Sequence, residues 1–243
     1  MKKYLLAAML ASVAAGAFGQ GLVVFYNRSS SGTPGPVVNP VYGVDSTCPT
    51  CVKQGAPSSS ITNQGSPAPV PAGTQVYGGA PLEGSGFSAA IWGTLDKPGD
   101  TTDDAILNDK TKDPNATALF RVAGTTASLR GFWTSSTVTV AGVPDGATDP
   151  NARGRFIIRA WDNKGGTLTT WAQALAAFTA GQTAIGESAI FTIPAALGNG
   201  TPSAPNPNLV GFESFQLHTV PEPSVIALGV LGAGCLFLLR RRK

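Results

Sequence analysis

The sequence predicts an all-β fold: a single β-sandwich or jelly-roll-like domain with one short helix, flanked by an N-terminal signal peptide and a C-terminal transmembrane helix. Charged residues make up only 13% of the 243 residues, whereas glycine and proline are frequent. Short apolar stretches alternate with turn-forming residues through the middle of the chain. Both ends carry apolar runs next to cations. Many short strands separated by turns are typical of a sandwich or jelly roll.

The first segment, Met1–Gly19, has the three parts of a secretory signal peptide. Lys2 and Lys3 form a basic start, residues 5–17 form an apolar stretch, and a small-x-small cleavage site follows. This pattern predicts export through the secretion translocon, with Gln20 as the first residue of the mature chain. The apolar stretch is too short to favour a permanent N-terminal anchor.

The exported domain, residues 20–217, contains eight candidate strands bounded by turn residues. Thr137–Ala141 alternates between threonine and valine, which indicates one buried face. In Arg155–Trp161, arginines and apolar residues alternate until Trp161 breaks the pattern, so both faces of that strand are expected to be partly covered. The predicted strands are Leu22–Asn27, Gly73–Tyr77, Phe87–Trp92, Ala118–Val122, Thr137–Ala141, Arg155–Trp161, Ser188–Ile193 and Phe212–Leu217.

One helix is predicted, with Thr170 as its N-cap and Gly181 as its end. Trp171, Leu175 and Phe178 share one face, which we expect to pack into the core at one edge of the sandwich. The remaining stretches rich in Gly, Pro, Ser, Asn or Asp are predicted loops: Ser29–Pro36, Pro49–Gly73, Pro98–Asn115 and Pro194–Asn208.

The C-terminal tail, residues 218–243, has the pattern of a membrane helix with a cytoplasmic end. The uncharged run Val225–Leu239 is about 22 Å long as a helix, short of a full span, and a start near Pro221 brings it close to spanning length. Ser224 can cap this helix, which we assign to residues 224–239. The basic end at 240–243 (Arg240, Arg241, Arg242 and Lys243) fixes the preceding chain on the outer side.

The tripeptide Pro221-Glu222-Pro223 stands directly before this apolar run. Tripeptide, apolar run and basic end together resemble the PEP-CTERM sorting signal, also catalogued as an ice-binding-protein C-terminal domain. The resemblance covers residues 220–243. It implies recognition by the membrane enzyme exosortase, with Pro221, Glu222, Pro223 and Ser224 as the sorting motif, and delivery to the cell surface or extracellular matrix.

Short segments of the middle are similar to exported PEP-CTERM proteins of Verrucomicrobia-type bacteria. These segments support the class of protein and imply no activity. They are Val24–Arg28, Val41–Asp45, Ile158–Asp162 and Leu209–Phe215.

The basic character of the precursor belongs to its two ends. The whole chain has a net charge of +3, but without the terminal cations and Glu222 there remain 11 basic and 13 acidic side chains. The exported part therefore carries about −2 and has no basic patch of the kind that nucleic acids require. No nucleic-acid partner is expected.

Cys48 and Cys51 have C-x-x-C spacing within a Pro- and Gly-rich stretch. A redox motif of this kind belongs at a helix start in a βαβ unit, and a structural zinc site needs a second pair of ligands. The third cysteine, Cys235, lies in the apolar tail. Because export leads to oxidising conditions, we expect a local Cys48–Cys51 disulfide.

No catalytic or metal-binding set is predicted, and no cofactor. The aspartates between Asp100 and Asp113 lack the spacing of a calcium loop, so a solvated acidic loop is favoured over a Ca²⁺ site. His218 is the only histidine and adjoins the tail, and no G-x-S-x-G nucleophile motif is present.

These observations predict a non-enzymatic exported protein with a structural or adhesive role. It would be held in the membrane by the C-terminal helix and reach the surface or matrix if processed, with extracellular polysaccharide as a candidate partner. The first alternative is a carbohydrate-binding module that stacks sugars on Trp92, Trp133 or Trp161. An ice-binding protein and a glycan hydrolase are the further alternatives. Core burial is the expected position of each tryptophan.

Overall fold

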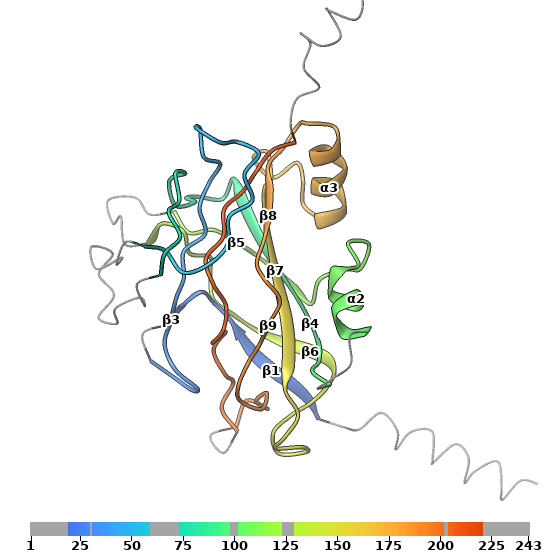
Figure 1. Cartoon of the computed structure of the whole chain (residues 1–243). Helices are drawn as coiled ribbons and strands as arrows, with labels where there is room; N and C mark the ends of the chain where they lie inside the picture. Colours follow the sequence, from blue (N-terminus) through green and yellow to red (C-terminus); the bar gives the residue numbers. More distant parts are fainter. Residues whose placement is uncertain are drawn as a thin grey trace, which may run out of the picture.

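The computed structural model describes residues 19–29, 31–58, 73–97, 102–122, 129–201 and 204–220. The predicted signal peptide up to residue 18 and the entire sorting tail from Pro221 to Lys243 lie outside these ranges. Within them the protein is mostly β-sheet, with two helices (Figure 1). No helix in the described ranges is long and apolar enough to cross a bilayer.

A five-stranded antiparallel sheet forms the centre of the molecule, in the order β5-β4-β7-β8, with β9 also paired to β7. Its two long strands, β4 and β7, run side by side over nine residues each, with Phe87 opposite Asp162 and Leu95 opposite Gly154. The bounds are β4 Phe87–Leu95, β5 Ala116–Leu119, β7 Gly154–Asp162, β8 Ile185–Glu187 and β9 Phe191–Thr192.

A second, two-stranded antiparallel sheet pairs β1 (Gln20–Phe25) with β6 (Ser136–Pro144). In β6, Val138 and Val140 are buried and the intervening threonines are exposed, as the alternation predicted. A short ribbon of β2 (Arg28–Ser29) and β3 (Val37–Val38), which the sequence did not predict, follows β1.

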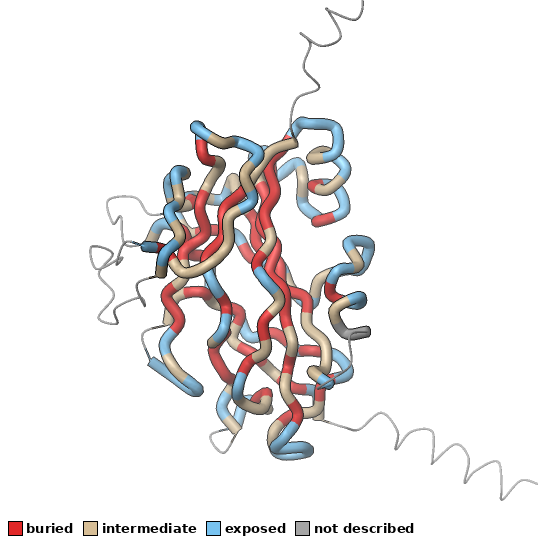
Figure 2. Tube along the Cα trace, in the orientation of Figure 1, coloured by how far each residue is buried: buried red, intermediate tan, exposed pale blue. Residues whose placement is uncertain are grey.

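The main core lies between the β1–β6 pair and the inner face of the central sheet. Alternate residues of β4 and β7 point into it, and they pack with apolar residues from β1, β6 and the C-terminal part of the chain. Figure 2 shows the buried residues running along these strands. Members that are fully buried include Val23, Phe25, Ile91, Trp133, Val140, Phe156, Ile158 and Phe215.

The outer face of the same sheet is covered by α2 (Thr102–Asn108) and α3 (Trp171–Thr179), which lie on one side of the sheet in Figure 1. A second cluster forms there around Trp92, Trp161 and Trp171. The T-shaped pairs Trp92–Trp171 and Trp161–Trp171 both have centroids 5.9 Å apart. The prediction that the β7 strand is covered on both faces is therefore confirmed.

The predicted helix is α3, and its N-terminus has a complete capping box. Thr170 accepts a hydrogen bond from the backbone of Gln173, whose side chain reaches back to the Thr170 backbone. Gly181 follows the helix with φ of +72°, a conformation that glycine adopts without strain. The helix packs over the face of β7 and β8 rather than at an edge alone, because Trp171 inserts between two sheet tryptophans.

Several predictions of local structure are wrong. Gly73–Tyr77 contains one isolated bridge, between Gln75 and Pro57, and Phe212–Leu217 contains isolated bridges to two different partners, so no continuous ladder forms in either segment. The predicted strand Ser188–Ile193 begins after β8 ends and retains only β9. The predicted loop Pro98–Asn115 contains α2, which packs Leu107 into the outer cluster.

Candidate functional site

The last described part of the chain, residues 212–220, is held from both sides; we call it the C-terminal segment. On one side, Tyr42 donates its amide to Phe215 O at 2.9 Å and accepts from the amide of Leu217 at 2.9 Å. On the other, His218 and Ile185 of β8 exchange backbone hydrogen bonds of 2.8 and 3.1 Å. Phe215 and Leu217 are buried in the main core. The segment thus bridges β8 and the stretch around Tyr42.

Residues 45–53 form a compact turn that we call the disulfide loop. Cys48 and Cys51 are bonded, which confirms the predicted disulfide, with their Cα atoms 5.4 Å apart. Lys53 Nζ lies 2.9 Å from Asp45 Oδ2 and closes the loop at its base. Hydrogen bonds from Thr47 and from Lys53 hold the pKa of the Asp45 carboxyl well below its usual range.

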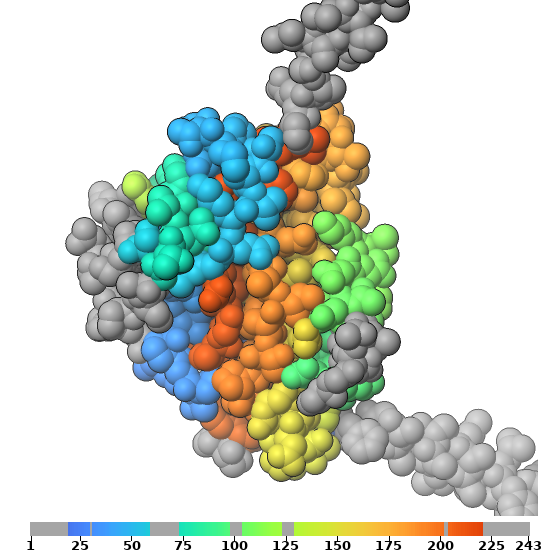
Figure 3. Space-filling model, in the orientation of Figure 1, coloured from blue at the N-terminus to red at the C-terminus, as the bar shows by residue number. Residues whose placement is uncertain are grey.

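The disulfide loop contacts the C-terminal segment directly. The Gln216 amide donates to Lys53 O at 3.2 Å, and the Gln216 side chain donates from Nε2 to Cys51 O at 3.0 Å. The Thr219 amide donates to Pro49 O at 2.8 Å. Figure 3 shows the pale-blue loop region beside the red C-terminal segment at the top of the molecule. The structure therefore brings Cys48 and Cys51 next to the point where the predicted sorting motif begins.

A pair of stacked tyrosines supports the same region. The rings of Tyr42 and Tyr77 are 4.2 Å apart and nearly parallel, at 5°. The Tyr77 hydroxyl lies 2.6 Å from Gly55 O and 2.7 Å from Ser214 O. Burial raises the pKa of Tyr42 to about 12 and raises the pKa of Tyr77 as well. Both phenols therefore stay neutral and act as hydrogen-bonding and packing groups.

His218 is part of this packing and is not set up as a catalytic base. Its ring lies edge-on to Phe178 at 5.3 Å, and its Nδ1 is buried without a hydrogen-bond partner among the described residues. Burial lowers the pKa of His218, and the charge of Lys110 lowers it further, while the charge of Glu187 opposes both. A triad histidine requires a group that orients the ring and a nearby nucleophile.

Sequence reasoning missed a buried cation under the two helices. The Arg159 side chain is fully buried, although the alternation of β7 indicated only that it shares a face with Arg155. Its Nε donates to Glu187 Oε2 at 3.2 Å and its Nη2 to Leu107 O at 2.7 Å. Its Cζ lies 4.6 Å from the Trp92 ring centroid and 5.3 Å from that of Trp171.

This arginine ties α2 and β8 to the centre of the sheet. Lys110 Nζ lies 3.4 Å from the other oxygen of Glu187, so the carboxylate is shared by two cations. Burial lowers the pKa of the Arg159 guanidinium, whereas Glu187 and Asp109 oppose that shift. The presence of Trp92 and Trp161 in two predicted strands was the sequence signal for an aromatic environment around it.

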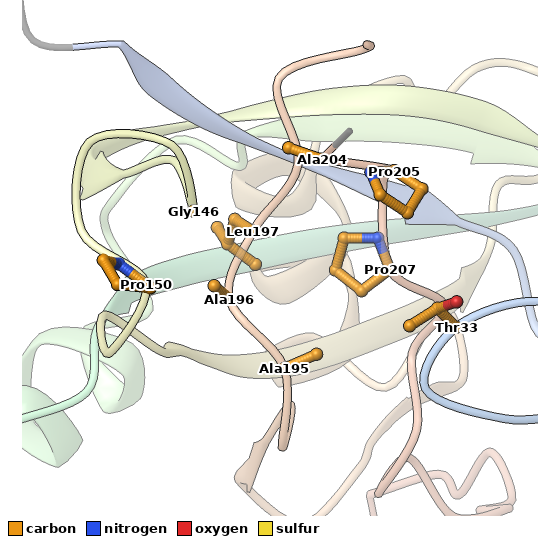
Figure 4. Close-up of a pocket in the computed structure, with 9 residues that line it drawn as sticks. All are labelled: Thr33, Gly146, Pro150, Ala195, Ala196, Leu197, Ala204, Pro205 and Pro207. Atoms are coloured by element: carbon orange, nitrogen blue, oxygen red, sulfur yellow. The ribbon is translucent and has the colours of Figure 1, made fainter. Parts of the chain in front are cut away.

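A small cavity of about 190 Å³ opens at the other end of the molecule (Figure 4). Its described lining consists of small or apolar residues, with the Thr33 hydroxyl as the one side-chain polar group. This lining offers no acid, base or nucleophile beyond that hydroxyl. The lining residues are Thr33, Gly146, Pro150, Ala195, Ala196, Leu197, Ala204, Pro205 and Pro207.

The remaining predicted site residues are accounted for as follows. Trp92, Trp133 and Trp161 are 4%, 0% and 0% exposed, which confirms core burial and removes them as sugar-stacking platforms. Asp104 pairs with Arg155 at 2.6 Å, and Asp109 accepts from Thr111 at 2.7 and 2.9 Å. In the described ranges, no group of three or more His, Cys, Asp or Glu side chains could hold a metal ion. Asp100 lies outside those ranges.

The predicted sorting residues Pro221, Glu222, Pro223 and Ser224 and the basic end Arg240, Arg241, Arg242 and Lys243 also lie outside the described ranges. Comparison of the chain with protein-family models, with curated proteins and with solved structures finds no match in any of the three.

Proposed function

We propose that this protein is a non-enzymatic surface or extracellular-matrix protein, exported by its signal peptide and sorted by its PEP-CTERM-like tail. Its domain has a structural or adhesive role. The secretion translocon, an exosortase-type enzyme and the membrane are the proposed partners during delivery, and extracellular polysaccharide is the proposed partner afterwards. The fold that we propose is an open sandwich of the β1–β6 pair and the central sheet, with α2 and α3 outside it.

The attachment of the C-terminal segment is the observation that carries this proposal. A retaining tail pulls on the domain at their junction, and a firmly packed junction bears that pull without local unfolding. Phe215 and Leu217 are buried in the core, and backbone hydrogen bonds continue to Thr219. Pro221 follows two residues later in the sequence. Tension on the tail would therefore act on a segment that is packed into the core rather than on a loose terminus.

The disulfide is a second support. Disulfides persist in oxidising compartments and are rare where glutathione keeps thiols reduced. The Cys48–Cys51 bond lies at the surface next to the exposed residues Thr50 and Val52, where a reducing agent would reach it. An accessible disulfide at this position supports a location outside the cytoplasm, in an oxidising compartment.

Deletion of Pro221–Lys243 tests the proposal in the native host. The truncated protein is expected to appear in the medium, while the full chain stays with membrane, surface or matrix. The intact mass of the mature protein in each fraction should lack Met1–Gly19, and a processed matrix form should lack the residues after the motif as well. Unchanged retention of the truncated protein would contradict the sorting role.

A matched control replaces Glu222 with Ala in the full chain, which keeps the apolar run and the basic end. Under the proposal, this variant stays in the membrane with its tail uncleaved. If it is processed like the parent chain, Glu222 has no role in recognition of the tail, and the proposed sorting motif is wrong.

A further inference from the structure

Backbone carbonyls of the disulfide loop accept hydrogen bonds from two of the last residues of the C-terminal segment, Gln216 and Thr219. Lys53 O, Cys51 O and Pro49 O accept from the Gln216 amide, the Gln216 side chain and the Thr219 amide. The Leu217 amide donates to Tyr42 O and the His218 amide to Ile185 O, and both acceptors lie outside the disulfide loop. Gln216 and Thr219 therefore depend on the loop, whereas the two residues between them do not.

We propose that the Cys48–Cys51 disulfide makes the attachment of the C-terminal segment redox-sensitive. With the bond formed, Gln216 and Thr219 are held against the loop. With the bond reduced, the loop carbonyls lose their fixed positions, and Gln216 and Thr219 lose the hydrogen bonds that they make to the loop. The stretch from Gln216 to Thr219, from which the tail leaves the domain, is then held less tightly.

Besides the disulfide, the loop is held by hydrogen bonds from the Cys48 amide to Asp45 O at 3.2 Å and from the Cys51 amide to Cys48 O at 3.1 Å. Its base is closed by the Asp45–Lys53 ion pair at 2.9 Å, and Thr47 hydrogen-bonds Asp45. Between Thr47 and Lys53, however, the chain turns with exposed residues, among them Val52 at 60% exposure. The disulfide is the one covalent constraint on the stretch that carries the Pro49 and Cys51 carbonyls. Losing these hydrogen bonds would change local opening far more than global stability.

The bond is also accessible to exchange. Cys48 and Cys51 are half-buried, and their neighbours Pro49, Thr50 and Val52 are exposed. A dithiol reduces the bond by thiol–disulfide exchange: one of its thiolates attacks a cysteine sulfur, its second thiol resolves the mixed disulfide, and the dithiol leaves as a cyclic disulfide. Two electrons and two protons pass to Cys48 and Cys51, which end as free thiols.

Amide hydrogen exchange of the full chain in detergent micelles, followed residue by residue by NMR, tests this inference. Addition of dithiothreitol should raise the exchange rates of the Gln216 and Thr219 amides at least tenfold. The rates of Leu217 and His218, which bond to Tyr42 and Ile185, should change less than threefold. Equal changes at all four amides, or no change at Gln216 and Thr219, would overturn the proposal.

The variant C48S/C51S separates loss of the bond from other effects of the reductant. Without dithiothreitol it should show the fast exchange of Gln216 and Thr219, and dithiothreitol should change nothing further. Slow exchange of core amides such as Ile158 and Val140 shows that the variant is folded. If the variant does not fold, C48A and C51A, measured singly with the free thiol alkylated, provide the same comparison.

The consequence for retention rests on the proposed function, whereas the exchange pattern does not. If the tail proves to have no sorting role, the difference between Gln216 and Leu217 upon reduction is still expected. If the exchange pattern is absent while deletion of Pro221–Lys243 releases the protein, sorting stands and the redox dependence fails.

Discussion

Arg159 donates from Nε to Glu187 Oε2 at 3.2 Å, although its side chain is fully buried and that of Glu187 is 30% exposed. The two partners are therefore solvated very differently. The carboxylate retains contact with water and with Lys110, whereas the guanidinium has two tryptophan rings, one backbone carbonyl and this carboxylate around it. This asymmetry makes the effect of removing each partner predictable.

Glu187→Ala should destabilise the fold by about 3 kcal/mol, because it leaves a buried cation without its counter-charge. Arg159→Met should cost about 1 kcal/mol, because it replaces the cation with an apolar chain of similar length and leaves a carboxylate that water and Lys110 can solvate. Urea unfolding followed by tryptophan fluorescence measures both values. A larger loss for R159M than for E187A would contradict this account.

Trp133 is the aromatic centre of the main core. Its ring centroid lies 5.0 Å from that of Phe25, 5.9 Å from that of Phe120 and 5.8 Å from that of Phe212. Trp133→Ala should lower the free energy of unfolding by about 3–5 kcal/mol, since three rings lose their common partner. Trp133→Phe keeps the ring contacts and should cost clearly less in the same thermal or urea assay. Equal losses for both variants would mean that the site collapses around either side chain.

The capping box of α3 gives a smaller and local effect. Thr170→Ala removes the acceptor for the Gln173 amide and should cost about 1 kcal/mol. Thr170→Ser keeps the hydroxyl and should stay within a few tenths of a kcal/mol of the parent protein. Chemical denaturation of the three proteins side by side compares them. A neutral T170A would show that Trp171 packing alone fixes the start of the helix.

Acidification should weaken the fold around His218. Burial and Lys110 lower its pKa in the folded state, while Glu187 opposes the shift, so the unfolded chain takes up a proton first as the pH falls. The contribution of neutral His218 is complete above the unfolded pKa of about 6.5 and is lost as the pH drops below it. The melting temperature should therefore fall more between pH 7.5 and pH 5.5 for the parent protein than for His218→Gln. Parallel pH profiles would exclude His218 as the cause.

Local sequence patterns predicted the elements that their own alternation or capping residues define. The alternation of Val138 and Val140 with threonines identified β6, and Thr170, Trp171 and Gly181 identified α3. The burial of β7 on both faces was also readable, because Trp161 departs from the alternation. Phe212, Phe215 and Leu217 favour a strand over residues 212–217, yet this segment bonds in turn to Gly55, Tyr42 and Lys53, and no local pattern encodes such changes of partner.

The site was only partly predictable for the same reason. C-x-x-C spacing and export indicated the Cys48–Cys51 bond, but its contact with Thr219 depends on how the whole domain closes. The alternation of the strand placed Arg159 on the face of Arg155 without fixing its exposure, and its burial depends on α2, which arises from an aspartate-rich stretch that reads as a loop. Leu107, which α2 buries against the sheet, gave too weak a helical signal on its own.

The hydrogen bond from Gln216 Nε2 to Cys51 O joins positions 165 residues apart. A chain that is synthesised and threaded through a membrane pore emerges with its N-terminus first, and contacts of such separation form late. Until the end of the domain has emerged, Phe215 and Leu217 are missing from the interior. If the chain is exported as we propose, its fold is completed only after Phe215 and Leu217 have left the pore.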